Sequence, residues 1–368
     1  MTRPRAARPA GVTRITALAV TALMVLPAVA AAAGGLRVRG TQLVYGPGAG
    51  RVLQLRGINR SGTEYACIQG WGFFQSTHPD AIDNPSMIAA MKSWDINVVR
   101  VPLNEDCWLG LRTPAGYGGP AYRRIIARYV HALNAAHLFV ILDLHWVAPA
   151  GARATGQLPM ADADHAPAFW RSVARTFRSD HELIFDLFNE PYGISWSCWR
   201  NGCRIPATAG KPAYRAAGMQ SLVDAVRSTG ATQPLLLGGV SYAGDLSGWV
   251  AHAPRDPDHQ LIASEHTYGG LSPCAAACLA AVAATHRRYP VEFGEMGETD
   301  CADGYVDRLM SWADAHGIGY LGWAWDATSN GWSCSAGPAL ITNYAGTPTA
   351  YGIGLRNHLR SLGPPALP

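Results

Sequence analysis

Two glutamates, each at the end of a short apolar run, are the residues of this chain best suited to work together chemically. The run 183–188 is followed by Asn-Glu-Pro, which contains Glu190, and the run 290–293 is followed by Gly-Glu, which contains Glu295. Parallel α/β folds keep their reactive groups at the carboxyl ends of strands. Two carboxyl groups that meet there suit the cleavage of a glycosidic bond, with one as acid and base and the other as nucleophile.

The elements that would position these glutamates recur along the chain. Eight apolar runs are predicted strands: residues 53–58, 96–101, 138–144, 183–188, 234–237, 260–264, 290–293 and 318–325. Apolar residues at helical spacing predict helices over 85–94, 121–136, 166–178, 213–229, 274–288 and 302–316. Alternating strands and helices imply parallel strands with right-handed crossovers. The sequence therefore predicts an α/β fold, a (β/α)8 TIM barrel, with a short β-hairpin over 36–45 in front of it.

Residues 1–33 are predicted to be a secretory signal peptide. They contain four arginines followed by an uncharged apolar stretch that ends in small residues, which is the pattern of an export signal. A membrane anchor is the alternative, because the apolar stretch is almost long enough to span a bilayer. Pro27 and the small residues favour cleavage, so residues 34–368 are expected to form a single secreted catalytic domain.

Composition and charge narrow the expected partners. The chain is 48% hydrophobic and 15% charged, with 30 basic and 26 acidic residues, which is typical of a folded domain with a large core. Without the four leader arginines, 26 residues of each sign remain. This balance does not favour nucleic acid or an anionic membrane, so a neutral saccharide polymer is the expected partner. We expect a monomer that needs no metal or other cofactor.

The eight cysteines predict up to four disulfides in an exported chain. Two pairs are close enough in sequence to staple single loops, and the other two would tie loops at neighbouring strand ends: Cys198 with Cys203, Cys274 with Cys278, Cys67 with Cys107, and Cys301 with Cys334. Zinc is the competing interpretation of the two short spacings. No matching Cys or His pair stands at finger spacing, which argues against it.

Further polar and aromatic residues fall at the ends of the predicted strands: Arg100, His145, Asn189, Glu190, His266, Tyr268, Glu295 and Trp323. Each short motif is weak by itself, but the set in this order resembles the signature of glycoside hydrolase family 5, the cellulase and mannanase family. The resemblance covers residues 53–325. It implies retention of configuration, for which the two carboxyl groups must lie about 5–5.5 Å apart.

The resemblance also implies a role for each glutamate. Glu190 would be the acid and base, and Glu295 the nucleophile. Arg100 would hold the negative charge of Glu295, and Tyr268 would donate a hydrogen bond to the same carboxylate. Glu292 is the rival of Glu295; the Gly-Glu-Met-Gly setting favours Glu295, and Glu292 is expected to pair with a buried cation.

The remaining residues of the set are expected to touch the sugar. Asn189 is suited to bind the 2-hydroxyl, and Trp323 offers a flat apolar face to a sugar ring. His145 and His266 would bind sugar hydroxyls or orient the glutamates. Candidate subsite residues near other strand ends are Asn59, Trp146 and Trp325. Glu298 is expected to lie in a loop.

The expected activity is that of a cellulase-like endo-β-1,4-glucanase. A β-mannanase, or an exo-acting hydrolase of aryl glycosides or glycolipids, is the alternative within the same family. Two alternatives come from other classes. One is a non-catalytic carbohydrate-binding barrel, which loss of either glutamate would indicate. The other is a metal-dependent hydrolase built on Asp143, His145 and His266, which would need further convergent ligands.

Overall fold

A computed structural model describes residues 1–2, 34–74, 85–208, 210–335 and 337–365. The predicted signal peptide, apart from its first two residues, lies outside the described residues. The described residues from Gly34 onward belong to one compact unit, which contains the whole fold described below. Within the described segments, no helix combines the length and the apolar character needed to cross a membrane.

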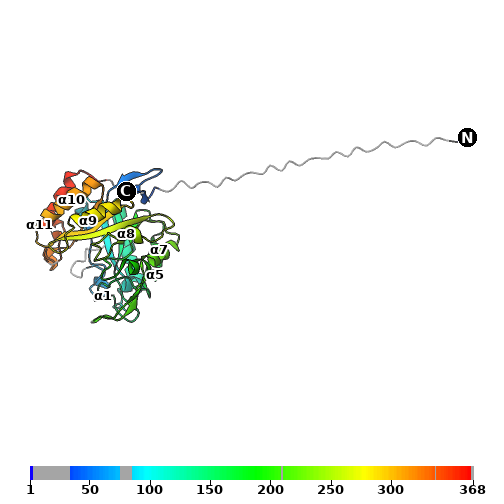
Figure 1. Cartoon of the computed structure of the whole chain (residues 1–368), viewed down its shortest axis with the longest axis horizontal. Coiled ribbons are helices and arrows are strands. Elements are labelled where there is room, and N and C mark those ends of the chain that lie inside the picture. Colours follow the sequence, from blue (N-terminus) through cyan, green and yellow to red (C-terminus); the bar gives the residue numbers. More distant parts are fainter. Residues whose placement is uncertain (3–33, 75–84, 209, 336, 366–368) are drawn as a thin grey trace. The chain divides into compact units, whose positions relative to one another are not determined.

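Eight parallel strands close into a barrel at the centre of this unit (Figure 1). They are β4 (Arg56–Asn59), β5 (Val98–Asn104), β6 (Phe139–Trp146), β7 (Leu183–Asp186), β10 (Leu235–Gly238), β11 (Leu261–Gly269), β12 (Val291–Glu298) and β13 (Gly319–Gly322). Neighbours in the barrel follow chain order, and β13 closes it by pairing with β4, where Tyr320 lies opposite Arg56. The predicted TIM barrel is therefore confirmed.

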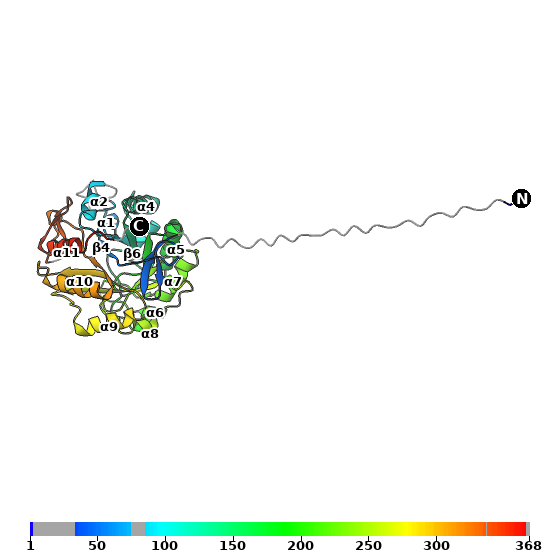
Figure 2. The ribbon, with the colours of Figure 1, turned by 90° about the horizontal axis from the view of Figure 1, so that it is seen from above.

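Helices surround the barrel, as Figure 2 shows around β4 and β6. The longer ones are α2 (Pro85–Lys92), α4 (Pro120–Ala135), α5 (Ala166–Phe177), α7 (Met219–Arg227), α9 (Ala276–His286), α10 (Gly304–His316) and α11 (Ala350–Ser361). Short helices are α1 (Ala66–Gln69), α3 (Glu105–Leu109), α6 (Trp196–Asn201), α8 (Trp249–His252) and η1 (Thr328–Asn330). Apolar residues at helical spacing bury one stripe of a helix against the barrel, as Phe169, Val173 and Phe177 do in α5. The sequence prediction missed α11.

The N-terminal hairpin is larger than predicted. It is a three-stranded antiparallel sheet of β1 (Arg37–Arg39), β2 (Gln42–Tyr45) and β3 (Arg51–Leu53). Leu43 and Leu53 pack with Val98 and Phe139 of the barrel interior. Burial of Leu53 in this sheet explains why the first barrel strand begins at Arg56 and not at the predicted residue 53. Two further small sheets pair β8 (Arg204–Ile205) with β9 (Tyr214–Arg215), and β14 (Ile341–Asn343) with β15 (Thr347–Pro348).

The barrel interior changes from apolar to polar along the strands. Val98, Ile141 and Ile184 belong to one apolar cluster inside the barrel. Side chains alternate along a strand, so the next inward positions, two residues on, are Arg100, Asp143 and Asp186. All three of these polar side chains are buried. The alternation therefore places a layer of charged side chains at the carboxyl end of the barrel, next to the apolar cluster.

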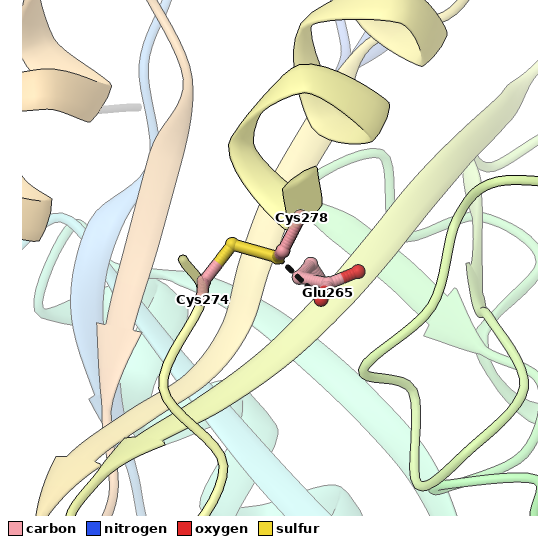
Figure 3. Close-up of side chains that lie close together, drawn as sticks. All are labelled: Glu265, Cys274 and Cys278. Carbon is pink, nitrogen blue, oxygen red and sulfur yellow. Dashed lines mark hydrogen bonds between the residues drawn. A yellow bond between two sulfur atoms is a disulfide. The ribbon is translucent and has the colours of Figure 1, made fainter. Parts of the chain in front are cut away.

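All four disulfides form with the predicted pairing: Cys67–Cys107, Cys198–Cys203, Cys274–Cys278 and Cys301–Cys334. Figure 3 shows the Cys274–Cys278 bridge beside Glu265, whose Oε1 lies 3.1 Å from Cys278 Sγ. Burial raises the pKa of Glu265 well above its usual range, so its neutral acid can donate to the sulfur. Because every cysteine is bonded to another, the zinc interpretation of the short spacings is wrong.

Candidate active site

Arg100 joins the polar groups at the carboxyl end of the barrel. Its guanidinium donates to Asp186 Oδ2 at 2.9 Å, Asn59 Oδ1 at 3.0 Å, Glu295 Oε1 at 2.7 Å and Asn189 Oδ1 at 2.9 Å. Asp143 Oδ2 lies 3.1 Å from the same guanidinium. Burial raises the pKa of both Asp143 and Asp186 to about 7, although Arg100 opposes this rise. One buried cation thus faces three acids, of which Glu295 is the one that also lines the cavity.

A β-bulge turns Glu295 into the barrel. In the ladder between β11 and β12, Glu265 pairs with Phe293 but His266 pairs with Glu295, so Gly294 is an extra residue. Strict alternation after the inward Glu292 would direct Glu295 away from the interior, and the bulge restores its inward direction. A side chain at Gly294 would lie 2.3 Å from Ser264 Oγ and 3.0 Å from His266 Nε2. The close approach of these groups therefore requires glycine at this position.

Two donors hold the Glu295 carboxylate in place. Arg100 donates to Oε1, and the hydroxyl of Tyr268 donates to Oε2 through a short hydrogen bond. Tyr268 is partly buried, and its desolvation together with the negative charge of Glu295 raises its pKa well above the usual range. The phenol therefore stays protonated and remains a donor. These contacts match the positions expected for Arg100 and Tyr268.

Glu190 lies at the other side of the site in an unusual backbone conformation. Its φ is 51°, a left-handed value that costs energy in a non-glycine residue and that is further disfavoured before proline. Gln157 Nε2 donates to its Oε2 at 3.0 Å and to its carbonyl oxygen at 3.1 Å. Burial raises the pKa of Glu190, and the hydrogen bond from Gln157 opposes that rise. A raised pKa suits a carboxyl group that must supply a proton.

His266 lies between the two glutamates. Its Nδ1 is 3.2 Å from Glu190 Oε1 and 3.6 Å from Glu295 Oε2. One carboxyl oxygen of each glutamate and a ring nitrogen of His266 all lie within 4.8 Å of one another. Burial lowers the pKa of His266 to about 3, so the ring is neutral and has one N–H to give. The short separation of the glutamates fits retaining glycosidases and is below the roughly 6.5–9.5 Å of inverting ones.

His145 and Trp323 form one wall of the site. His145 Nδ1 donates to Asp143 Oδ2 at 2.6 Å, and its Nε2 can accept from Asn189 Nδ2 at 3.5 Å. The rings of His145 and Trp323 stack with their centroids 5.5 Å apart and 14° between their planes. Burial lowers the pKa of His145, which favours the neutral ring that this bonding pattern needs. Asn189 is thereby fixed from both ends, by Arg100 and by His145.

A cavity of about 550 Å³ opens above these groups. Six of the predicted site residues line it, and His266 and Arg100 support it from below. The lining residues are His145, Asn189, Glu190, Tyr268, Gly270, Leu271, Glu295, Thr299, Trp323, Ser335, Gly337 and Pro338. A cleft of this size, with few polar groups that converge on one point, is typical of a small-molecule or sugar subsite.

The three candidate subsite residues do not line this cavity. Asn59 is fully buried, and its amide binds Arg100 and the carbonyl oxygen of Gly294. Trp325 is also fully buried; its ring meets Trp94 edge-to-face at 4.8 Å and so faces the helical layer. The subsite prediction is therefore wrong for Asn59 and Trp325. Trp146 is partly exposed beside His145, 6.2 Å from the ring of Tyr65.

Glu292 and Glu298 also differ from expectation. Glu292 points at Gly319 on the neighbouring strand, and its Oε2 has no hydrogen-bond partner within the described part of the chain. Burial raises the pKa of Glu292 well above its usual range, so it is a neutral acid and not the partner of a buried cation. Glu298 is the last residue of β12 and accepts from the backbone N–H of Val306 at 2.9 Å, so it does not lie in a loop.

Sequence reasoning missed Gln157 and Asp186. Asp186 carried a signal, because it is the single charged residue of the apolar run 183–188. Gln157 carried none, since it belongs to the long loop between β6 and α5. The metal-dependent alternative gains no support, because Asp143, the proposed ligand, is already bonded to both Arg100 and His145. Asp143, His145 and His266 are also not one of the groups with metal-binding spacing that the described residues form.

Comparison with known proteins agrees with this geometry. The pattern of the cellulase family, glycosyl hydrolase family 5, matches residues 50–329. A manganese dependent endoglucanase, Eg5A, of Phanerodontia chrysosporium is 30% identical over 204 residues, which are 54% of this chain and 46% of that protein. A mannan endo-1,4-beta-mannosidase of Streptomyces lividans is 25% identical over 316 residues, which are 82% of this chain and 68% of that protein.

Solved structures share the fold at lower identity. XacCel5A in complex with cellopentaose gives a TM-score of 0.62 at 21% identity, over 83% of this chain and 99% of that one. The beta-mannanase of Streptomyces thermolilacinus with mannohexaose gives 0.61 at 20% identity, over 89% of this chain and 94% of that one. These likenesses concern the fold. Because the family pattern covers most of the chain, from the N-terminal sheet to the loop after β13, the protein belongs to glycosyl hydrolase family 5.

Proposed function

We propose that this protein is an exported, retaining β-glycosidase that cleaves β-linked polysaccharide by double displacement. The observation that carries the proposal is the position of Glu190 and Glu295, whose carboxyl oxygens lie within 4.8 Å across the floor of a cavity. The four disulfides support export, because such bonds persist in oxidising compartments.

In the first step, Glu295 attacks the anomeric carbon while Glu190 protonates the leaving oxygen. Arg100 and Tyr268 hold both oxygens of Glu295, which fixes the direction of attack. The raised pKa of Glu190 keeps a larger fraction of it protonated for this step. The C–O bond to the leaving group breaks and an ester bond to Glu295 forms.

In the second step, the now ionised Glu190 takes a proton from water while the water oxygen attacks the anomeric carbon. The bond between that carbon and Glu295 breaks, and the Glu295 carboxylate is released. Two inversions give net retention at the anomeric carbon. Neutral His266, 3.2 Å from Glu190, can donate to the ionised carboxylate between the steps. Asn189, held by Arg100, presents its remaining N–H toward the cavity, where the 2-hydroxyl of the reacting sugar would lie.

A β-1,4-glucan is the proposed substrate. Trp323 provides an apolar face beside the two glutamates. Tyr192, two residues after Glu190 in the chain, stacks on Tyr242 with 4.5 Å between the ring centroids. Aromatic faces of this kind suit the flat pyranose rings of a neutral polymer. The endoglucanase relative supports this choice.

A β-1,4-mannan is the second candidate. The mannanase of Streptomyces lividans aligns with 82% of this chain, against 54% for the endoglucanase. Glucose and mannose differ only in the direction of the 2-hydroxyl, so the contact of Asn189 with that group would decide between them. A product profile on cellulose, mixed-linkage glucan, glucomannan and mannan separates the two. Cleavage of mannan alone would refute the glucan assignment.

The mechanism is tested with the variants Glu190→Gln and Glu295→Gln. Each is expected to reduce turnover of polysaccharide by roughly 10³-fold or more. With a dinitrophenyl glycoside, whose leaving group needs no acid, the first step of Glu190→Gln should be restored while Glu295→Gln stays inactive. Proton NMR of the first product should show the β-anomer. Release of the α-anomer, or near-normal activity of either variant, would refute the assignment.

A further inference from the structure

The long loop between β6 and α5, residues 147–165, carries Gln157 to the acid proposed above. Gln157 Nε2 donates to Glu190 Oε2 at 3.0 Å and to the Glu190 carbonyl oxygen at 3.1 Å. Side-chain packing holds this part of the loop only weakly, since Ala154 is the single buried residue of the fully described stretch 150–157. One methyl group buries little apolar surface. The position of the stretch therefore depends mainly on its hydrogen bonds.

Side chains at the junction of β5 and α3 bind both backbone groups of Ala154. Asn104 Nδ2 donates to the carbonyl oxygen of Ala154 at 2.8 Å, and the N–H of Ala154 donates to Asp106 Oδ2 at 3.0 Å. Asn104 and Asp106 are fully buried, so water does not compete for these bonds. The two contacts fix the place and the direction of the chain three residues before Gln157.

Asn104 and Asp106 are themselves held in place. Asn104 caps α3, since its Oδ1 accepts from the N–H of Cys107 at 3.0 Å. Arg112 donates to the other oxygen of Asp106 at 2.9 Å. The amide and the carboxylate therefore have little freedom to rotate away from Ala154.

Glu105, between these two residues in sequence, contacts both ends of the same loop. Its Oε2 accepts from the N–H of Ala148 at 3.2 Å. One of its carboxyl oxygens also lies within 4.8 Å of a carboxyl oxygen of Asp162, which accepts from the N–H of His165 at 2.8 Å. Three consecutive residues, Asn-Glu-Asp, thus contact the start, the middle and the end of the loop that carries Gln157.

We propose that Asn104 and Asp106 are positioning residues for Glu190, and that they act on it through Ala154 and Gln157. The inference rests on the proposed function, because that function makes Glu190 the acid and base. Without the two bonds to Ala154, the stretch that carries Gln157 can shift, and the hydrogen bond to Glu190 Oε2 is made less often. That hydrogen bond favours the ionised carboxylate, so its loss raises the pKa of Glu190.

The direction of the shift separates this route from a direct electrostatic one. If the negative charge of Asp106 acted on Glu190 through space, its removal would favour the ionised carboxylate and lower the pKa of Glu190. Removal that acts through Gln157 raises it. The charged and titratable groups that face Glu190 are Arg100, Asp143, His145, Tyr242, His266, Tyr268 and Glu295, and those that face Asp106 are Glu105, Arg112 and His165.

The test is the pH dependence of kcat/KM for a soluble polysaccharide, measured with the full chain. Asp106→Ala and Asn104→Ser should each move the alkaline limb upward, by at most the shift of about one pH unit expected for Gln157→Met. Serine keeps an oxygen that can cap α3 but is too short to reach Ala154. Asp106→Asn keeps an oxygen for the N–H of Ala154 and should restore most of the original limb.

Asp164→Ala is the matched control. Asp164 also accepts a backbone N–H of this loop, that of Ala150 at 2.8 Å, but it is exposed, so the limb should stay in place. In the Gln157→Met background, Asp106→Ala should add no further shift, because the two changes act along one route. Shifts that add, or a limb that moves downward in Asp106→Ala, would overturn the positioning role.

Hydrogen exchange on the unaltered chain guards against misfolding of the variants. The N–H of Ala154 should exchange far more slowly than that of the exposed Gly151, and equal rates would overturn the bond to Asp106. If Gln157→Met moves the limb but neither Asp106→Ala nor Asn104→Ser does, the inference fails and the acid assignment stands. If Gln157→Met leaves the limb in place as well, both fail.

Discussion

Replacement of Gln157 by methionine should shift the pH dependence of catalysis upward. Methionine keeps the length of the side chain but removes the N–H that reaches Glu190 Oε2 at 3.0 Å. That hydrogen bond favours the ionised form of Glu190, so its loss favours the protonated acid and raises the pKa of Glu190. The acid then stays protonated to higher pH, and the alkaline limb of kcat/KM moves in the same direction.

The size of the shift follows from the contact. A hydrogen bond to a charged group is worth about 1.5–3 kcal/mol, and one pKa unit corresponds to about 1.4 kcal/mol. The Glu190 side chain is 17% exposed, and water can replace part of the lost bond. We therefore expect a shift of about one pH unit, at the low end of the range.

The assay is kcat/KM for a soluble polysaccharide between pH 4 and 10, since this ratio reports the free enzyme. Gln157→Glu is the companion variant, because a second carboxyl beside Glu190 should move the limb further upward. Circular dichroism and Tm should show that both variants fold. An unchanged alkaline limb, or one that moves to lower pH, would refute Glu190 as the acid or Gln157 as its partner.

Three other perturbations test the site and the fold. Tyr268→Phe removes the donor to Glu295 and should lower kcat by roughly 10–100-fold with little change in Tm; an unchanged kcat would contradict its role. Trp323→Ala, made in the inactive Glu295→Gln variant, should raise the Kd for an oligosaccharide substrate by about 10-fold or more in a binding titration; equal affinity with and without Trp323 would remove it from the sugar site. Loss of the Cys67–Cys107 bridge, which closes 40 residues, should cost about 4 kcal/mol, against about 2 kcal/mol for Cys274–Cys278, which closes 4; equal losses in denaturant melts would contradict the loop-entropy explanation.

The sequence by itself determined the barrel and its two glutamates. Short apolar runs that alternate with amphipathic stretches can bury their faces only as parallel strands covered by helices. Glu190 and Glu295 were identified because each follows such a run. The cysteine pairs were also predictable, because two of them close single loops and the other two join loops that the strand order brings to the same end. Local patterns suffice where burial alone selects the structure.

Tertiary structure decided which way side chains point and which groups share a partner. The sequence of a strand buried on both faces does not show which way its side chains point. In β12 the bulge at Gly294 turns Glu295 into the site, while Glu292 remains lower in the barrel. Trp325, three residues beyond β13, was mistaken for a subsite residue because its position after a strand does not show which way its ring points. Gln157 reaches Glu190 only because a long loop folds back over the barrel. Such contacts join residues far apart in the chain, and no local pattern records them.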